Sequence, residues 1–474
     1  MARRNGPAVA EPMRVHVLSG TPGAGKSTAM LVNAAEHEGR YLFAVPSILL
    51  LEEQAKRLED IAPSATVVRI HSRSGVRGAV KRQIADLLDQ SGSHVVGFIT
   101  HEGLLDADLS QFVGWHARID EPPHGFHRGH IRIEESLPYF MAKFDLDPVG
   151  QGSRWSQLKP RASISWPKVQ SDTLAKDLVD FRKLAARPQG IFVDVASWEE
   201  TSHRPVTWFS LWTPLQLRSF ESVVVAGAGY LTSLAYCACR EIFGDDVGFD
   251  TSDMSEPRSA QPRITVHYFT LGHEGSTVYW NTDEGRSCLV STCKWFERTA
   301  THIGYWSGNE VVRLLFHDRI EGERVSPKVA GLNSLRQHDS CLFLYSSKAQ
   351  PNDVKLHDLL TMTDEDVRRA REDEDILQFA WRGAIRNPDY DGPYDIYLYS
   401  RDQAEQLAST LQTAGFLTVE LRGVPEAGIM NVTRPQAKRE AARQGTADMS
   451  GRLERKRERG RERARKHRAK KKAS

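Results

Sequence analysis

The sequence predicts an α/β protein in which two lobes, each built on a mostly parallel sheet covered by helices, precede a basic tail. The chain has 474 residues, enough for two or three domains with cores of their own. Short apolar runs typical of buried strands alternate with helical patterns in two separate stretches. We therefore expect a first lobe at 13–260, a second lobe at 261–425 and a tail at 426–474.

The first lobe is predicted from strand patterns that surround a less regular insertion. The expected strands are Arg14–Leu18, Tyr41–Val45, Val67–Ile70, Val95–Thr100 and Val223–Val225. Ser47 is placed to cap one helix, and a second helical pattern runs around Lys81 to Leu88. Between 123 and 220 the pattern loosens, with many prolines, tryptophans and charged residues. One strand, Gly190–Val195, is expected inside this insertion.

The second lobe is predicted from a further series of apolar runs. The expected strands are Cys288–Ser291, Cys341–Tyr345, Ile396–Tyr399 and Leu417–Leu421. A helix between the last two places Leu407 and Leu411 on one face and is expected to end at Gly415.

The charge of the chain is unevenly distributed. From Asn431 to Ser474 there are 17 Lys or Arg residues against 5 Asp or Glu, a net +12, so the total of +2 leaves −10 on the rest. This end has too few apolar residues to fold by itself. We expect it to bind the phosphate backbone of a nucleic acid, with a membrane surface or an acidic protein as the alternatives.

The remaining composition favours a cytoplasmic protein without a membrane partner. No stretch approaches the roughly 20 apolar residues that span a bilayer. The five cysteines lack the two-pair spacing of a zinc site, so we expect reduced core thiols rather than a four-sulfur site. They are Cys237, Cys239, Cys288, Cys293 and Cys341. The histidines at 116, 124, 127 and 130 are expected to be loop residues rather than zinc ligands.

A phosphate-binding loop is the strongest local signal. Gly20 to Ser27, GTPGAGKS, matches G-x4-G-K-[ST] and lies between a predicted strand and a predicted helix. Its backbone N–H groups would wrap the phosphates of ATP, Lys26 would reach the β- and γ-phosphates, and the Ser27 hydroxyl would bind Mg²⁺. The predicted nucleotide-binding residues here are Gly20, Thr21, Pro22, Gly23, Ala24, Gly25, Lys26, Ser27 and Thr28.

Asp120 and Glu121 supply the acidic pair that such a loop requires. They follow Trp115–Ile119, a segment less apolar than a central strand should be, and Pro122–Pro123 would end that strand. Asp120 is expected to hold Mg²⁺ together with Ser27, and Glu121 to orient or deprotonate the attacking water.

With these motifs the chain resembles the superfamily 2 (DEAD-like) helicases, in particular the replication helicases of phages and plasmids. The resemblance implies two RecA-like lobes. Val45–Ser47 with Gln54, and Ile99–Glu102, resemble motifs that contact nucleic acid. Val225–Ala228 falls where the family has its Ser-Ala-Thr coupling motif but lacks both hydroxyls, and Thr232 and Ser233 are near enough in sequence to replace them.

Two further motifs of the family are matched in the second lobe. Lys328–Leu335 resembles the fifth motif, which implies that Gly331 and Asn333 lie at the nucleotide. Gln378–Asn387 resembles the sixth, which implies catalytic roles for Gln378, Arg382 and Arg386. An arginine that meets the γ-phosphate contributes about 10³ to 10⁵ in rate.

The two arginines are four residues apart, so on a helix they would share a face. Trp381 stands where many relatives have glycine, and Trp381, Trp295 and Trp306 are expected to pack in cores rather than stack on bases. The alternative for the arginines is a basic helix face paired with the acidic run Glu372–Asp375.

These observations predict an ATP-hydrolysing helicase or translocase acting in DNA replication. It would hold a single strand of DNA or RNA in the groove between the lobes, bind the backbone through its tail and meet other replication proteins. One alternative is a packaging motor like the large subunit of phage terminase, which should carry clustered carboxylates in a nuclease lobe. The other is a nucleic-acid-binding adaptor that binds nucleotide without turnover.

Overall fold

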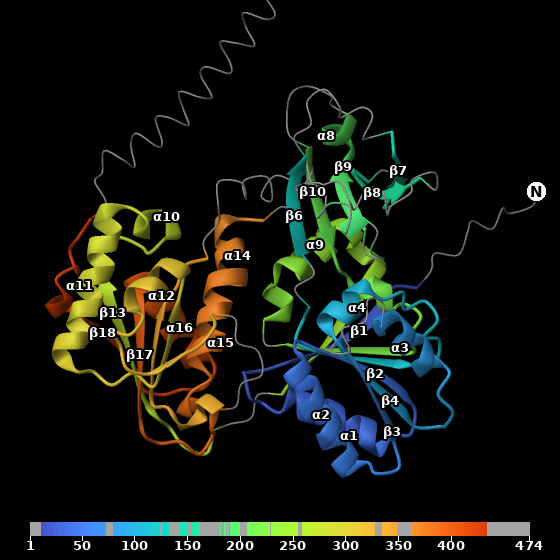
Figure 1. The fold of residues 1–474 in the computed structure, drawn as a ribbon, viewed down its shortest axis with the longest axis horizontal. Coiled ribbons are helices and arrows are strands. Elements are labelled where there is room, and N and C mark those ends of the chain that lie inside the picture. The colour runs from blue at the N-terminus through green and yellow to red at the C-terminus, as the bar shows by residue number, and fades with distance from the viewer. Residues whose placement is uncertain are drawn as a thin grey trace, which may run out of the picture.

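Three sheets form the framework of the protein, which was analysed as a computed structural model (Figure 1). The structure describes residues 11–72, 79–123, 126–131, 142–149, 153–161, 190–199, 206–227, 229–254, 258–327, 334–347 and 362–433, with single positions 181, 184, 185 and 187. The basic tail beyond 433, including the predicted nucleic-acid contacts there, lies outside the described residues.

The first lobe is built on a seven-stranded parallel sheet in the order β12-β1-β11-β5-β2-β4-β3. The strands are β1 Met13–Ser19, β2 Arg40–Val45, β3 Thr66–Ile70, β4 Val95–Thr100, β5 His116–Asp120, β11 Ser222–Ala226 and β12 Val247–Asp253. All five strands expected in this lobe outside the insertion are present. β5, the strand that ends at the acidic pair, is central despite its mixed composition.

Helices cover both faces of this sheet because its strands are apolar on both sides. They are α1 Lys26–Glu36, α2 Ile48–Ile61, α3 Ala79–Leu88, α4 His101–Asp106 and α9 Leu234–Phe243, with the short turns η2 Pro214–Leu217, η3 Tyr230–Thr232 and η4 Gly244–Asp246. Phe43 of β2 packs under α1 and α2, whereas Leu42 faces the core shared with α3 and α4. Ser47 caps α2 as predicted, accepting a hydrogen bond from the Leu50 N–H at 3.3 Å.

The insertion carries a sheet of its own, so the expectation of a single strand there is wrong. Five antiparallel strands lie in the order β6-β10-β9-β8-β7. They are β6 Phe126–Ile131, β7 Phe144–Pro148, β8 Trp155–Pro160, β9 Ile191–Asp194 and β10 Val206–Leu211, with the helix α8 Val195–Glu199. β6 and β7 are edge strands rich in polar residues, which hides them from a hydrophobicity pattern.

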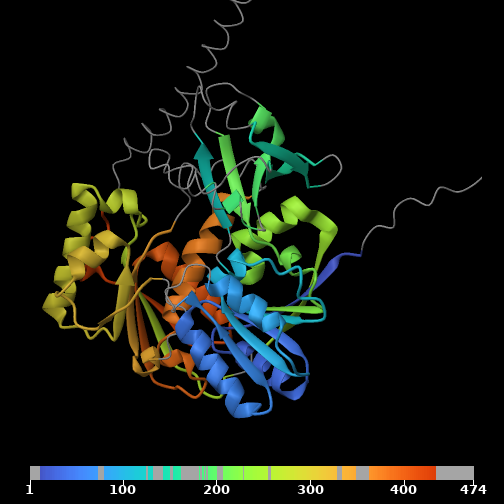
Figure 2. The ribbon, with the colours of Figure 1, turned by 45° about the vertical axis from the view of Figure 1, so that its right-hand side comes forward.

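This smaller sheet is fastened to the first lobe by its apolar face. Phe192 and Phe209 point into the core of the first lobe, whereas Val193 and Trp208, on the opposite face, belong to a separate cluster. The sheet stands above the first lobe in both ribbon views (Figures 1 and 2). The insertion thus extends the first lobe rather than interrupting its sheet.

The second lobe is built on a six-stranded parallel sheet in the order β15-β14-β16-β17-β13-β18. Its strands are β13 Arg263–Thr270, β14 Tyr305–Gly308, β15 Glu323–Arg324, β16 Ser340–Leu344, β17 Pro393–Ser400 and β18 Val419–Gly423. Its helices and turns are α10 Thr277–Trp280, α11 Asp283–Thr299, α12 Glu310–Phe316, η5 Ser334–Gln337, α14 Asp364–Arg368, η7 Arg369–Asp373, α15 Glu374–Ala380, η8 Ala384–Arg386, α16 Arg401–Thr413 and η9 Pro425–Ala427.

One strand prediction in this lobe is wrong. Cys288–Ser291 lies within α11, where Cys288, Leu289, Cys293 and Phe296 recur at helical spacing on the buried face. The run looked like a strand because a short apolar segment has no clear period. The helix before β18 is confirmed: α16 buries Leu407 and Leu411, and Gly415 follows its end with a φ of 94°.

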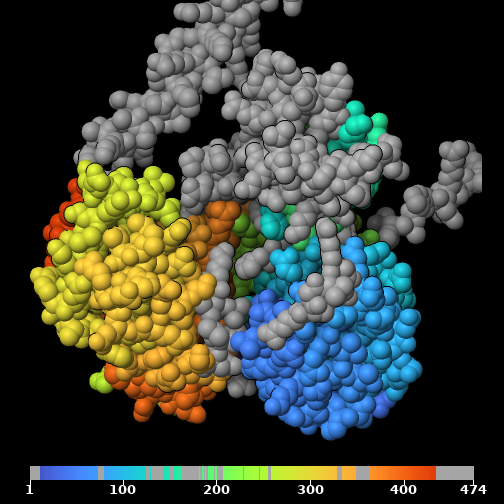
Figure 3. Space-filling view, in the orientation of Figure 1, coloured from blue at the N-terminus to red at the C-terminus, as the bar shows by residue number. Residues whose placement is uncertain are grey.

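The two lobes stand side by side (Figure 3), with α15 of the second lobe facing the first (Figure 1). Within the described residues, no helix is both long and apolar enough to cross a membrane.

Candidate nucleotide site between the lobes

The phosphate loop connects β1 to α1 and is shaped by its glycines. Gly20, Gly23 and Gly25 have φ values of 127°, 89° and 78°, a region that residues with a Cβ rarely adopt. Lys26 Nζ donates to the carbonyl oxygens of Gly20 and Thr21, both at 2.8 Å. Burial lowers the pKa of Lys26, and the nearby carboxylates, Asp120 first, oppose that change. The loop therefore holds the Lys26 side chain through its own backbone carbonyls.

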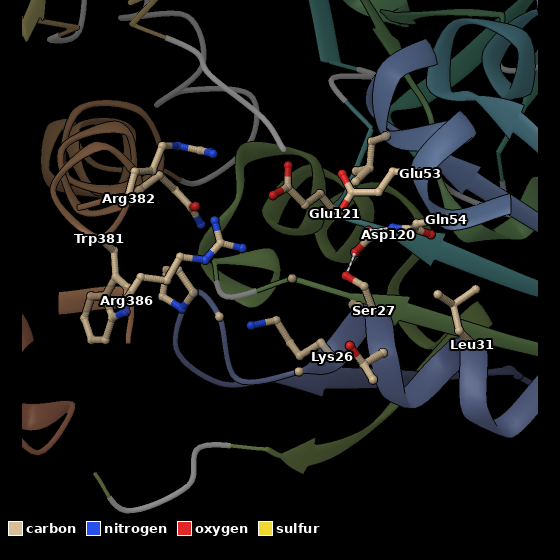
Figure 4. Close-up of a pocket in the computed structure, with 18 of the residues that line it drawn as sticks. Lys26, Ser27, Leu31, Glu53, Gln54, Asp120, Glu121, Trp381, Arg382 and Arg386 are labelled. Carbon is tan, nitrogen blue, oxygen red and sulfur yellow. Dashed lines mark hydrogen bonds between the residues drawn. The ribbon is translucent and has the colours of Figure 1, made fainter. Parts of the chain in front are cut away.

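Asp120 lies at the end of β5, where two hydrogen bonds fix both carboxylate oxygens. Ser27 Oγ donates to Oδ1 at 2.7 Å, and Gln54 Nε2 donates to Oδ2 at 2.5 Å (Figure 4). Burial raises the pKa of Asp120, while these two hydrogen bonds and Lys26 oppose the rise. A hydroxyl and a carboxylate that already face one another are oxygen ligands of the kind that Mg²⁺ prefers, so the residues present fit this ion.

Glu121 adopts a backbone conformation that is unusual for a residue with a side chain. Its φ is 60°, and its N–H donates to the Ala226 carbonyl at 2.8 Å, which holds the turn against β11. Burial, and after it repulsion by Asp120, raise the pKa of Glu121 to about 7, while Arg382 opposes the rise. A carboxyl with a pKa near neutrality is suited to accept a proton from water.

Gln54 and His101, which belong to the segments that resemble nucleic-acid motifs, support the acidic strand. Gln54 is buried, and its side-chain amide donates the hydrogen bond to Asp120 that is described above. His101, at the start of α4, is also buried, and its Nε2 lies 3.0 Å from the backbone oxygen of Asp120. Gly227 packs closely against Pro122, since a Cβ built on Gly227 would lie 2.8 Å from Pro122 Cδ. Gln54, His101 and Gly227 thus contact the acidic turn from three different segments of the first lobe.

Arg382 and Arg386 reach the pocket from the second lobe, but not from one helix. α15 ends at Ala380, Gly383 is extended, and Arg386 closes the short turn η8, so the expected i,i+4 helical face is wrong. The side chains nevertheless both line the pocket that contains Lys26 and Glu121 (Figure 4). The backbone changes direction between the two arginines, and the side chains converge from different angles.

The wall formed by the second lobe is strongly cationic. Burial lowers the pKa of Arg382, whereas Glu121 opposes the change. Burial together with repulsion from Arg336 and Arg382 lowers the pKa of Arg386 to about 10. Arg382 is buried, Arg386 is half-buried and Arg336 is exposed, and the three charges repel one another across the pocket. This grouping favours a polyanionic ligand, because such a ligand relieves their mutual repulsion.

Arg336 was missed by the sequence analysis. It lies in η5, directly after the segment that resembles the fifth motif, and its side chain lines the pocket. Glu53 and Arg57 of α2 also line the pocket and were not predicted. Arg57 lies three residues after Gln54 and four after Glu53, a helical spacing that could have indicated Arg57, since residues three or four apart share a face.

The acidic run of the second lobe does not pair with the arginines, so that alternative is wrong. Glu372 and Asp375 accept hydrogen bonds from other groups of the second lobe. Gln378 lines the pocket and donates through Nε2 to Glu374 Oε1 at 3.0 Å. Arg382 is left facing Glu121 of the first lobe.

The segment at the position of the coupling motif is only partly described. Ala226 and Gly227 line the pocket, whereas Ala228, like the predicted nucleotide residues Gly331 and Asn333, lies outside the described residues. Thr232 Oγ1 donates to the Gly229 carbonyl at 3.1 Å, and Ser233 caps α9. Both hydroxyls are thus used locally, and neither replaces the missing coupling hydroxyls in this arrangement.

The residues considered for metal sites lie in ordinary structural positions. His116 is in strand β5 rather than in a loop, and its Nδ1 lies 2.9 Å from Ser222 Oγ. His127 is in β6, while His124 and the side chain of His130 lie outside the described part of the chain. Cys237 and Cys239 lie in α9, and the others lie in the second lobe, where all three are buried. No group of three possible metal ligands occurs among the described residues.

The tryptophans weighed as base-stacking residues lie in or against cores. Trp306 and Trp381 are buried, and Trp295 packs against the second-lobe core from a partly buried position. Trp381 also lines the nucleotide pocket and meets Phe416 edge-on at 5.1 Å between ring centroids.

Comparisons with known proteins identify the fold. No protein-family model matches the chain, and no curated protein matches it in sequence. A solved structure described as "XPD_APO" matches with a TM-score of 0.50 at 9% identity, covering 87% of this chain and 97% of that one. The chain shares the overall fold of that structure. Its two parallel sheets are RecA-like lobes.

Two other solved structures are similar at lower scores. One described as "XPD_Helicase" has a TM-score of 0.47 at 10% identity and covers 87% of this chain and 96% of that one. "Structure of S. tokodaii Xpd4" has a TM-score of 0.44 at 10% identity, covering 86% of this chain and 95% of that one. At these identities the likeness is one of fold, so the activity has to be argued from the site.

Proposed function

We propose that this protein is an ATP-dependent nucleic-acid helicase or translocase. The observation that carries the proposal is one pocket lined by residues of both lobes. Lys26, Ser27, Asp120 and Glu121 enter it from the first lobe and Arg382 from the second. Arg386 and Gln378 lie on the same wall as Arg382.

Each side chain has a role in hydrolysis that follows from its position. Lys26 would exchange its two carbonyl partners for phosphate oxygens of ATP. Ser27 and Asp120 would hold Mg²⁺, which when bound neutralises charge on the β- and γ-phosphates. Glu121, a carboxyl with a pKa of about 7, would orient the water and accept its proton.

The arginines would supply the charge that hydrolysis requires at the γ-phosphate. Arg382 and Arg386 are planar donors already desolvated in the pocket, so their attraction for a phosphoryl group is little weakened by water. Gln378 would hold the segment that carries them. Gly331 and Asn333 are proposed to complete the nucleotide site from the same lobe.

Movement along a strand would follow from the division of the site between lobes. Closure brings the arginines to the phosphates, and loss of the γ-phosphate removes the ligand that favours closure. A single strand of DNA or RNA in the inter-lobe groove would favour the same closed form. The basic tail would add backbone contacts that weaken with salt. We also propose that the protein acts in DNA replication, together with other replication proteins.

The test combines turnover with unwinding. ATP hydrolysis would be measured with no strand, with single-stranded DNA and with single-stranded RNA, and unwinding by separation of a fluorescent duplex with a single-stranded end. Lys26→Ala is the matched control, because it removes the phosphate-binding cation. Strand-stimulated turnover together with unwinding or translocation is expected. Turnover indifferent to every strand would contradict the proposal, and ATP binding without turnover would favour an adaptor.

A further inference from the structure

The inter-lobe linker leaves the first lobe beside the phosphate loop. It comprises residues 254–262, between β12 and β13. The Met254 N–H donates to the Ser19 carbonyl at 3.1 Å, and Ser19 Oγ donates to the Ser252 carbonyl at 3.2 Å. Ser19 is the last residue of β1 and directly precedes Gly20. The first end of the linker is therefore attached to the strand that carries the loop.

Four residues after Met254, Arg258 of the linker forms hydrogen bonds with the turn that carries Arg386. Arg258 Nη1 donates to the Ile385 carbonyl at 2.8 Å, and Nη2 donates to the Asn387 carbonyl at 2.6 Å. The Arg258 guanidinium also lies 4.6 Å from the centre of the Phe416 ring. The two carbonyls belong to the residues on either side of Arg386, so one planar side chain fixes its backbone from both sides.

The turn that carries Arg386 is short. η8 has three residues, and the Arg386 and Asn387 N–H groups donate to the Gly383 and Ala384 carbonyls, both at 3.0 Å. Nε of Arg386 is buried without a hydrogen-bond partner among the described residues. Arg336 and Arg382 repel its charge. Because Nε makes no hydrogen bond, the position of the guanidinium depends on the backbone of the turn and on the packing of the side-chain stem beside Gly23.

The short linker limits how far the two sites can separate. From Met254 to Arg258 an extended chain reaches at most about 14 Å. Beyond Arg258 the attachment continues, since Ser259 Oγ and the Ala260 N–H both donate to the Pro388 carbonyl, at 3.0 and 3.1 Å. Residues 255–257 lie outside the described part of the chain, and their number alone limits how far the two attached ends can separate.

We propose that Arg258 is a positioning residue that holds the turn of Arg386 to the linker and so sets the place of this arginine relative to the phosphate loop. The inference rests on the proposed function and extends it to a residue outside the pocket. The paired hydrogen bonds from Arg258 hold the backbone on both sides of Arg386, so this arginine meets the γ-phosphate in a fixed geometry.

The experiment replaces Arg258 in the full-length protein. Arg258→Met keeps the length of the side chain but removes both donors, and Arg258→Lys keeps the charge and a single donating group. We expect Arg258→Met to lower kcat for strand-stimulated hydrolysis by about tenfold to hundredfold, the size of effect that a small misplacement of a catalytic group produces. The KM for ATP should stay within twofold, and Arg258→Lys should recover part of kcat. Arg422→Met, at an exposed arginine of the same lobe, is the matched control.

A double substitution separates positioning from a general loss of structure. If Arg258 acts through Arg386, adding Arg258→Met to Arg386→Ala should change the single-turnover rate less than twofold, because the group to be positioned is already gone. An equal fall in both backgrounds would overturn the inference, as would an unchanged kcat in Arg258→Met.

Two outcomes distinguish the inference from the function on which it rests. If Arg258→Met fails to fold, Arg258→Lys tests the inference in its place. A wild-type kcat in Arg258→Lys would count against a role of Arg258 in positioning Arg386. Wild-type protein without any strand-stimulated turnover would overturn the proposed function, and the inference with it. Normal wild-type turnover with indifferent variants would overturn the inference alone.

Discussion

Glu121 is expected to make ATP hydrolysis depend on pH around neutrality. Its folded-state pKa is about 7, raised mainly by burial and secondarily by Asp120. Below that pH the carboxyl is protonated and cannot accept a proton from water, so activity should fall as the pH falls. The pH dependence of kcat/KM reports this group in the free protein.

The magnitude follows from the ionised fraction. With a pKa of about 7, roughly one tenth of the carboxyl is ionised at pH 6 and roughly nine tenths at pH 8. We therefore predict that kcat/KM rises about tenfold between these values. A glutamate with an ordinary pKa of about 4.3 would be almost fully ionised throughout and would give a nearly flat profile.

The assay is the initial rate of hydrolysis at low ATP and saturating strand, in buffers of constant ionic strength. Glu121→Gln is the control, because it removes the titrating group and leaves the titration of ATP itself. We expect this variant to be slower by about 10² to 10⁴ and to lose the rise with pH. A flat wild-type profile, or the same rise in Glu121→Gln, would refute the assignment.

Three further substitutions test other contacts. Gly23→Ala should lower turnover at saturating ATP at least tenfold. The left-handed φ of 89° disfavours a residue with a Cβ, and that Cβ would also lie 3.1 Å from Arg386 Cγ. Unchanged turnover would contradict that geometry. Gln54→Leu should raise the Mg²⁺ concentration needed for half-maximal turnover, because Asp120 loses the hydrogen bond to Oδ2; an unaltered Mg²⁺ requirement would argue against the role. Ser47→Ala should lower the free energy of unfolding by about 1 kcal/mol in urea titration through loss of a helix cap, and an unaltered midpoint would speak against it.

Local chemistry made much of the first lobe predictable. The phosphate loop combines a glycine pattern with a preceding strand and a following helix, and each of these signals is short-range. Ser47 likewise caps its helix through neighbouring backbone groups. The acidic pair was predictable from its chemistry even though β5, with Arg118 in its centre, is a poor match to a buried strand.

Other features depended on contacts between distant parts of the chain. Arg336 and Arg258 gain their roles from packing against residues more than 40 positions away, which no local pattern encodes. The hydrogen bond from Gln54 to Asp120 joins residues 66 positions apart, so the motif that contains Gln54 does not reveal it. The five-stranded insertion sheet was missed because its edge strands are polar.

The most direct test of the shared site is the effect of Arg382→Ala on strand-stimulated ATP hydrolysis, with the exposed Arg422→Ala as the matched control. If the second lobe supplies the arginine to a site built on the first, Arg382→Ala should lower kcat by about 10³ or more, and Arg422→Ala should leave it unchanged. Equal turnover in Arg382→Ala and wild-type protein would contradict a nucleotide site completed by both lobes.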